Sequence, residues 1–528
     1  MALAAVGRQQ REGVPPMEAA LRYVERKALR TDPREGFVEA HVAVQAGCGR
    51  HLLRDVLLLL TGAVPEEAAQ VLRSARLVPL RKPDGRSRPI GIGGWLRRFA
   101  SSLAVDVVRA DTVAWLQRSG QLGMRTQGGA EVVIHTIRAA WDQSTRAAQQ
   151  YDTREAFRRG AAAAQPHADG PAPRPLKRAR DDGQGDDSIA DAPGGARPEE
   201  DFACIRIDFQ NAFNRVPRSI ARRLLCRHAP HCVPLFDRLY GVPGNKADDP
   251  ILSVGGSTLT IAARTGCTQG CWLSPLICAL LIAHLTERVL AKEPGGKPPD
   301  ACSGILSYLD DVHIFGPLEF ATRVAHAFAA ETATIAPGML LTKVVGFAAG
   351  KSMPSADRLP PGVDADKPSH WVSYGEGFTI MNVLAARHAG DEQQDDRQLV
   401  QNQQFCEVHR LVAALDAHAA HMLLAYVTCA RPTYWMRTLP PAWASNAALA
   451  HDAFAQSMLR DITGHVTRAA PDGRDVLPAD DPEDDDDGSL GQWGLAAFIA
   501  SIPRKHGGCG YRSAVRLAPA AYFASVTR

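Results

Sequence analysis

Residues 305–315 read ILSYLDDVHIF, and this stretch decides the fold. Apolar residues lead up to Asp310 and Asp311 and resume directly after them. Because Asp disfavours strands and favours turns, the pattern predicts a tight β-hairpin with two carboxylates at its tip. Two carboxylates about 4 Å apart repel by roughly 4 kcal/mol at an effective dielectric of 20. The pair is therefore either a turn that is merely acidic or a cation site, for which Mg²⁺ is the natural occupant because it prefers oxygen ligands.

Composition indicates a large globular protein. The chain has 528 residues, of which 45% are hydrophobic and 22% charged. That length exceeds one hydrophobic core, so we expect several subdomains. The net charge is only +3, yet residues 1–142 carry 21 Lys and Arg against 14 Asp and Glu. This basic excess suits a polyanionic partner, although a solvated basic surface explains it equally well.

Cysteine usage and targeting signals predict an intracellular protein. The 11 cysteines are odd in number and scattered, which favours a reducing compartment over a disulfide framework. We find no signal peptide and expect no membrane-spanning segment, because the longest apolar run that we identify, around residues 56–60, is short. Residues 173–180, PRPLKRAR, resemble a nuclear-import peptide, so the expected location is nuclear or otherwise cytoplasmic.

A basic hairpin is expected at residues 75–92, after two helices within residues 51–75. Its cations are Arg81, Lys82, Arg86 and Arg88. They either protect a solvated sheet edge or clamp phosphate oxygens. Residues 95–142 are again mostly helical and are interrupted by a glycine-rich loop at 119–129.

Residues 143–200 lose all periodicity, which predicts a disordered insertion. Order returns at residues 203–209, an alternating strand that places Asp208 at its end before a turn and a helix. Such an Asp is either an N-cap or a metal ligand on a rigid edge. Asp310 and Asp311 would supply the partner carboxylates that favour the second interpretation.

A second hairpin is expected at residues 251–263, followed by TGCTQGCWLSPL at 265–276 and a long apolar helix. Ser274 is predicted to cap this helix and Pro275 to lie in its first turn. The two glycines and Gln269 suit a loop that supports a flat group, although a glycine-rich connector fits the same residues.

The order of Asp208 with Phe213, then TQGCWLSPL, then SYLDD resembles the palm of reverse transcriptases. More narrowly, it is similar to the polymerase of non-LTR (LINE-like) retrotransposons, in particular the site-specific elements of protists. The hairpin RKPDGRSRPI resembles the family's fingers motif, and QLGMRTQGG resembles the loop that follows it. RPTYWMRTLPPAW at 431–443 and HGGCGYRSAVRLAPAAYFAS at 506–525 resemble its thumb and post-thumb signatures.

This resemblance implies an α+β right-hand polymerase that carries out RNA-directed DNA synthesis, primed at a nick in target DNA. The implied partners are an RNA template, a DNA primer or nicked target DNA, and dNTPs; the implied cofactor is a pair of Mg²⁺ ions, with Mn²⁺ as a substitute. The implied parts are a helical extension at 1–45, fingers at 46–142, the insertion at 143–200, a palm with part of the fingers at 201–395, and a helical thumb and post-thumb region at 396–528 with an acidic loop at 471–489.

The resemblance also assigns roles to single residues. Asp208, Asp310 and Asp311 are the implied catalytic metal ligands, with the Phe209 carbonyl as a further ligand. The residues implied to contact the nucleotide are Lys82, Arg88, Phe213, Gln269 and Gly270. Phe213 would crowd the sugar 2′ position and so favour deoxynucleotides, and Tyr308 would pack near the primer end.

Two segments depart from the family pattern. Residues 338–343, GMLLTK, fit the family's next palm motif loosely, so Lys343 is only a weak candidate proton donor to pyrophosphate. Asn382 and Val383 replace the usual Leu-Gly of the primer-grip region. The sequence shows no nuclease signature, and we expect it to be a fragment of a longer element. Two alternatives stay open: an RNA-dependent RNA polymerase, which Phe213 argues against, and a catalytically defective or domesticated copy that only binds RNA.

Overall fold

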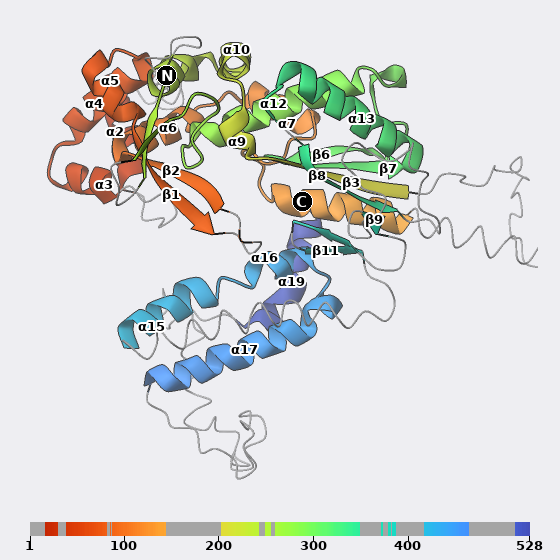
Figure 1. Ribbon diagram of the computed structural model, residues 1–528. Helices are drawn as coiled ribbons and strands as arrows, with labels where there is room; N and C mark the ends of the chain where they lie inside the picture. The colour runs from red at the N-terminus through yellow and green to blue at the C-terminus, as the bar shows by residue number, and fades with distance from the viewer. Residues whose placement is uncertain are drawn as a thin grey trace, which may run out of the picture.

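A five-stranded sheet, here called the central sheet, organises the protein (Figure 1). The computed structural model describes residues 16–29, 38–81, 85, 87–143, 202–241, 249–254, 259–339, 341–348, 371–372, 378–381, 383–386, 417–463 and 513–527. The sheet order is β6-β7-β3-β8-β9, formed by β6 (Gly304–Tyr308), β7 (Asp311–Pro317), β3 (Phe202–Phe209), β8 (Leu341–Ala348) and β9 (Trp371–Val372). β3 pairs antiparallel with both β7 and β8, so the strand that ends near Asp208 is central.

The two faces of the central sheet pack into different cores. Ile205, Ile207 and Val312 belong to a large core that includes α12 (Leu273–Leu290) and α13 (Leu318–Ile335). The alternate residues of these strands point the other way, because side chains alternate across a sheet.

That other face is covered by C-terminal helices and by a helix over residues 129–143. Phe202, Cys204 and Phe315 lie in a second core. Most of its other members come from the helix over residues 129–143 and from α16 (Thr433–Thr438), α17 (Pro441–Thr463) and α19 (Ala514–Val526), and Leu122 and Ile380 also belong to it. Before α16 lie α15 (Ala417–Leu423) and a π-helical turn, η7 (Leu424–Thr428). The carboxylate-bearing face of the sheet therefore looks toward this group of helices (Figure 1).

A second, four-stranded sheet joins the two predicted hairpins. The expected hairpin at 75–92 is β1 (Ala75–Arg81) and β2 (Ser87–Gly93), and the one at 251–263 is β4 (Ile251–Val254) and β5 (Thr260–Ala262). The order β2-β1-β4-β5 arises because β1 pairs parallel with β4, a contact between segments about 175 residues apart that the sequence did not indicate. Farther along the chain, β10 (Phe378–Ile380) and β11 (Val383–Ala386) form a separate hairpin.

Helices before and between the hairpins complete this half of the molecule. The two helices expected within 51–75 are α4 (Gly49–Thr61) and α5 (Glu66–Arg73). The elements α2 (Pro16–Ala28) and α3 (Val38–Gln45) pack on α4, and α6 (Trp95–Asp106) and α7 (Ala110–Arg118) follow the first hairpin. After β3 come α9 (Ala212–Arg215), α10 (Arg218–His228), the short turn η2 (Pro230–Cys232) and α11 (Val233–Tyr240), and η4 (Pro294–Gly296) follows α12.

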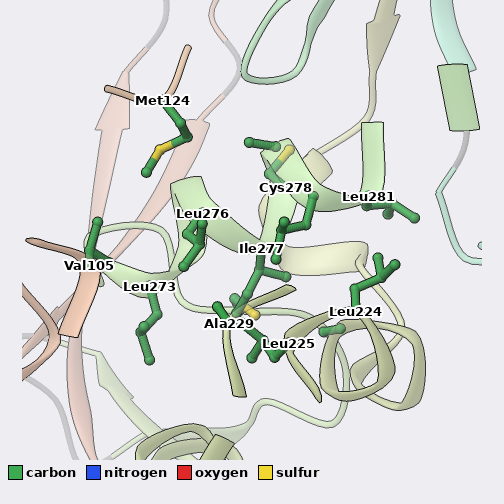
Figure 2. Close-up of a cluster of buried hydrophobic side chains, with 14 of the residues drawn as sticks. Val105, Met124, Leu224, Leu225, Ala229, Leu273, Leu276, Ile277, Cys278 and Leu281 are labelled. Carbon is green, nitrogen blue, oxygen red and sulfur yellow. The ribbon is translucent and has the colours of Figure 1, made fainter. Parts of the chain in front are cut away.

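α12 is the apolar helix at the centre of the larger core. Figure 2 shows Leu273, Leu276 and Ile277 of α12 beside Leu224 and Leu225 of α10. By length and hydropathy α12 could cross a membrane, a segment that our sequence criterion overlooked, but 72% of it is buried inside the protein. Such burial is typical of a core helix, because a lipid-facing span would expose its apolar surface.

The start of α12 differs from the prediction. The helix begins at Leu273 with Trp272 at the N-cap position, so Ser274 is not the cap. The Ser274 hydroxyl instead donates to the Thr268 carbonyl at 2.9 Å. Pro275 lies in the first turn, as predicted, where its missing N–H costs no hydrogen bond. The serine thus holds the preceding loop against the helix rather than capping it.

Candidate active site

Three carboxylates meet at one end of the central sheet. The β3–β7 pairing includes Ile207 opposite Val312, and one further step in that register sets Asp208 opposite Asp311. β6 and β7 pair as far as Tyr308 opposite Asp311, which leaves Leu309 and Asp310 as a two-residue hairpin loop. The hairpin predicted from ILSYLDDVHIF is therefore present, and its tip lies beside the end of β3.

The three carboxylates lie close enough together to raise the pKa of Asp310. Burial raises it to about 6, and the negative charges of Asp311 and Asp208 add to the rise. The positive charge of Arg88 opposes this rise; Arg88 is on β2 of the four-stranded sheet, here called the outer sheet. Asp310 is therefore affected by three charged side chains from different elements: Asp208, Asp311 and Arg88.

Asp311 forms an ion pair with Arg206 of the same chain. Arg206, two residues before Asp208 on β3, donates from Nη2 to Asp311 Oδ1 at 3.0 Å. Both side chains are about one-third exposed, at 32% and 34%, so the pair is solvent-screened and weak. A guanidinium at this position relieves part of the repulsion among the carboxylates.

The donor set suits a divalent metal ion in kind. Carboxylate oxygens are the ligands that Mg²⁺ prefers. Among the described residues, however, no three His, Cys, Asp or Glu side chains form a group arranged to hold a metal ion. Asp311 is held instead in an ion pair with Arg206 through Oδ1, so Arg206 would compete with a metal ion for that oxygen.

The hairpin tip is held by a glutamine that the sequence analysis did not select. Gln121 is fully buried, and its Nε2 donates to the Leu309 carbonyl at 3.0 Å. Its Oε1 accepts from the Leu309 amide and from the Gly123 amide, each at 2.9 Å. Leu309 has φ 56°, a left-handed conformation that is strained for a branched side chain. Gln121 thereby satisfies both peptide groups of the strained residue that precedes Asp310.

The backbone around Gln121 is also joined to β6. The Leu122 amide donates to the Ser307 carbonyl and the Ser307 amide donates to the Gly120 carbonyl, both at 2.8 Å. A Cβ on Gly120 would lie 2.1 Å from the Ile305 carbonyl oxygen, and one on Gly123 would lie 2.4 Å from the Leu309 amide nitrogen. Glycine is needed at both positions because the loop lies directly on the hairpin backbone.

The loop that holds Gln269 and Gly270 packs on the basic hairpin formed by β1 and β2. The Gly91 amide of β2 donates to the Gln269 carbonyl at 2.8 Å. Gly270 has φ 116°, and a Cβ there would lie 2.7 Å from the Gly91 carbonyl oxygen. The half-buried Gln269 and exposed Gly270 are thus fixed to the strand that carries Arg88.

The remaining predicted residues lie near the same end of the sheet where they are described. Phe213 is half-buried in α9, and its carbonyl accepts from the Cys267 amide at 2.7 Å, next to the loop that holds Gln269. Phe209 is buried, with its ring 6.4 Å from that of Phe328, and its own carbonyl as a metal ligand stays a prediction. In the β3–β8 pairing the backbone of Lys343 lies opposite Asp208.

Lys82 lies outside the described residues, as do Arg86 and the insertion predicted at 143–200, apart from its first residue. Asn382 and the acidic loop at 471–489 lie outside them as well.

A C-terminal helix also reaches the site. The Tyr434 hydroxyl, on α16, donates to the carbonyl of Met381 in the β10–β11 turn at 3.3 Å. Burial raises the pKa of Tyr434 to about 12, with Glu131, Tyr308 and Asp311 adding to the rise. Tyr308 is half-buried and pairs with Asp311 in register. Tyr434 therefore joins α16 to the β10–β11 turn and lies close enough to Tyr308 and Asp311 for them to affect its pKa.

Comparisons with known proteins add little to this geometry. No protein-family model matches the chain, and no curated protein sequence matches it. A solved structure of apo telomerase from Candida tropicalis, truncated from its C-terminal domain, is similar with a TM-score of 0.32 and 10% identity. The similarity covers 54% of this chain and 51% of the telomerase chain, so the chain spans about half the length of that relative. A resemblance this distant carries no argument about fold or function, so the function has to be argued from the site itself.

Proposed function

We propose that this chain is an RNA-directed DNA polymerase. The observation that carries the proposal is the meeting of Asp208 from β3 with Asp310 and Asp311 from the β6–β7 hairpin. Clustered carboxylates at the end of a rigid sheet are the arrangement that nucleotidyl transfer requires. In this proposal the central sheet is the palm, the outer sheet with its helices is the fingers, and the C-terminal helices are the thumb.

The carboxylates would hold two Mg²⁺ ions, or Mn²⁺ in their place, with the Phe209 carbonyl as a further ligand. When bound, these ions would activate the primer 3′-hydroxyl and stabilise the charge of the departing pyrophosphate.

The other residues would position the substrates. Arg88 and Lys82 would bind the triphosphate, since Arg can donate two parallel hydrogen bonds to phosphate and Lys acts as a point charge. The Gln269–Gly270 loop would support the new base pair, because it is fixed to the strand that carries Arg88. Lys343 would donate a proton to pyrophosphate; its backbone position opposite Asp208 is compatible with that role.

Phe213 and Tyr308 would select the sugar and the primer end. Phe213 is half-buried and is the second residue of α9, directly after the turn that ends β3, where an aromatic ring would exclude a 2′-hydroxyl. Tyr308 lies opposite Asp311, where its ring would pack against the primer terminus. The finer assignment is a non-LTR retrotransposon enzyme that acts in the nucleus and extends a primer at nicked DNA.

The test is nucleotide incorporation on a primed RNA template, with dNTPs and NTPs supplied separately. We expect incorporation of dNTPs, and loss of it in Asp310→Asn while RNA binding persists. Asp111→Asn is the matched control, because its side chain is 89% exposed on α7. Preference for NTPs would identify an RNA-dependent RNA polymerase instead. Equal signals from the intact protein and Asp310→Asn would identify a protein that only binds RNA.

A further inference from the structure

A groove lined by arginines lies on the opposite side of the central sheet from the carboxylates. It has a volume of about 460 Å³ and lies among α10, α12 and α13. The lining residues are Ile220, Arg223, Leu224, Arg227, His284, Arg288, Thr334 and Ile335. α12 and α13 pack against the face of the sheet that carries Ile205 and Ile207, whereas Asp208 projects from the other face. The groove and the Asp208 side chain therefore lie on opposite sides of the central sheet.

Part of the positive charge of the groove has no carboxylate partner among the described residues. Arg223 and Arg227 are exposed and stand one turn apart on α10, and neither is paired with a carboxylate in the part of the chain that the structure describes. Arg288 donates to Glu331 at 2.6 Å, and Lys292 pairs with the same carboxylate at 2.6 Å. Glu287, the other nearby acid, accepts from the indole nitrogen of Trp115. The acidic groups around the groove are thus already engaged.

The guanidinium groups converge on one imidazole. His284 has its pKa lowered by burial and by the positive charges of Arg288, Arg227 and Arg223, while Glu287 opposes the shift. The ring is therefore neutral at pH 7 and adds a hydrogen-bonding group without adding charge. Apolar side chains of α10 and α13 form the floor beneath the charged rim.

We propose that this groove binds the phosphate backbone of a single RNA strand outside the polymerase cleft. Arginine forks match phosphate oxygens bidentately, and the apolar floor can take a base or ribose. The choice of RNA rests on the proposed function, which requires an RNA template longer than the part inside the cleft. The groove would hold a second segment of that strand.

The experiment measures RNA affinity against salt with an unstructured polyuridine strand. The variant is Arg223→Ala/Arg227→Ala. The matched control is Arg50→Ala/Arg54→Ala, which removes two exposed arginines at the same spacing from α4. Losing two phosphate contacts on a single strand should reduce the salt slope by about 1.4, and the affinity by about 25-fold near 0.1 M salt. The control should change neither by a comparable amount, and Arg223→Lys/Arg227→Lys should retain most of the slope, because it keeps the charge.

A footprint locates the contact independently of affinity. Cys226 is an exposed thiol between the two arginines on α10, and Cys48 is an exposed thiol elsewhere. We expect polyuridine to slow alkylation of Cys226 but not of Cys48. Equal affinity losses in the two alanine pairs, or an unprotected Cys226, would overturn the proposal. Protection by inorganic phosphate alone, without added protection by RNA, would overturn it in favour of a small-anion site. Incorporation assays on the same preparations test the polymerase separately, since RNA binding here does not require catalysis.

Discussion

Under the proposed function, Gln121→Met should slow nucleotide incorporation without changing any residue that is proposed to touch substrate. Methionine has a similar volume, so the buried site stays filled while the amide is lost. The substitution removes three hydrogen bonds: one donated to the Leu309 carbonyl and two accepted from the Leu309 and Gly123 amides. Two of these bonds are to Leu309, so at about 1 kcal/mol net for each bond the hairpin tip loses about 2 kcal/mol of restraint. That matches the roughly 1 to 2 kcal/mol that a left-handed non-glycine residue costs, so Leu309 would no longer be held in this conformation.

The relaxation matters because Asp310 follows Leu309 directly. A shift of about 1 Å in a catalytic group can reduce the rate about 100-fold. We therefore expect kcat for dNTP incorporation to fall by about that factor, with a smaller change in KM, since Arg88 is on another element. Hydrogen exchange of a peptide that covers residues 305–312 should become faster, because the Leu309 amide loses its partner.

Gln117→Met is the matched control. Gln117 lies four residues earlier, on α7, and its Nε2 donates to the Thr126 hydroxyl at 3.2 Å near the surface. It should leave both kcat and the exchange of residues 305–312 near the values of the unsubstituted protein. If Gln121→Met exchanged faster at the hairpin yet kept its kcat, the hairpin tip would not need this restraint for catalysis. If neither quantity moved, the hydrogen bonds to Leu309 would not be what holds it.

Three further predictions test other parts of the structure. Gly123→Ala should lower the free energy of unfolding in urea by more than about 2 kcal/mol and abolish incorporation, because the added Cβ would lie 2.4 Å from the Leu309 amide nitrogen. Gly94→Ala is the control and should have little effect, because an added Cβ there would meet nothing within 4 Å. Tyr434→Phe removes the hydroxyl that donates to the Met381 carbonyl and should raise KM for the primer several-fold in steady-state incorporation assays, with dNTP KM unchanged. The free energy of unfolding in urea should fall as pH drops below about 6.5, because the histidines bind protons in the unfolded protein while burial keeps them neutral in the folded protein. A urea midpoint that does not change with pH in this range would contradict the prediction. The histidines whose pKa is lowered chiefly by burial include His135, His231 and His451.

Features that depend on neighbouring residues were predictable from the sequence. The hairpin at 305–315 follows from apolar alternation interrupted by two turn-favouring residues, and both β1–β2 and β4–β5 follow from the same kind of pattern. The residue pairs involved are close along the chain, so local propensity and register agree. The approach of Asp208 to the hairpin was suggested by the type of the three residues and by the family resemblance, because no spacing rule connects segments about 100 residues apart.

Features that depend on distant contacts were missed for the same reason. Gln121 reads as one polar residue in a glycine-rich loop, and nothing near it in the sequence indicates a partner 188 residues later. Ser274 was misassigned for a different reason: its hydroxyl donates to the carbonyl of Thr268, only 6 residues earlier, instead of accepting from an amide of α12. Gly120 and Gly123 in the 119–129 loop could have indicated that this loop packs on another backbone segment, since close backbone approach is a main reason for glycine in a loop.

The apolar core fixes the register that brings the carboxylates together. Ile205 and Ile207 of β3 face the core around α12, and Arg206 and Asp208 alternate onto the other face. A slip of one residue against β7 would reverse the two sets and bury both charged side chains among apolar ones. Burying an unpaired charge costs several kcal/mol, more than one strand pairing can return. The position of Asp208 opposite Asp311 is thus set by the isoleucines beside it, so a carboxylate pair that repels is held by residues that take no part in the chemistry.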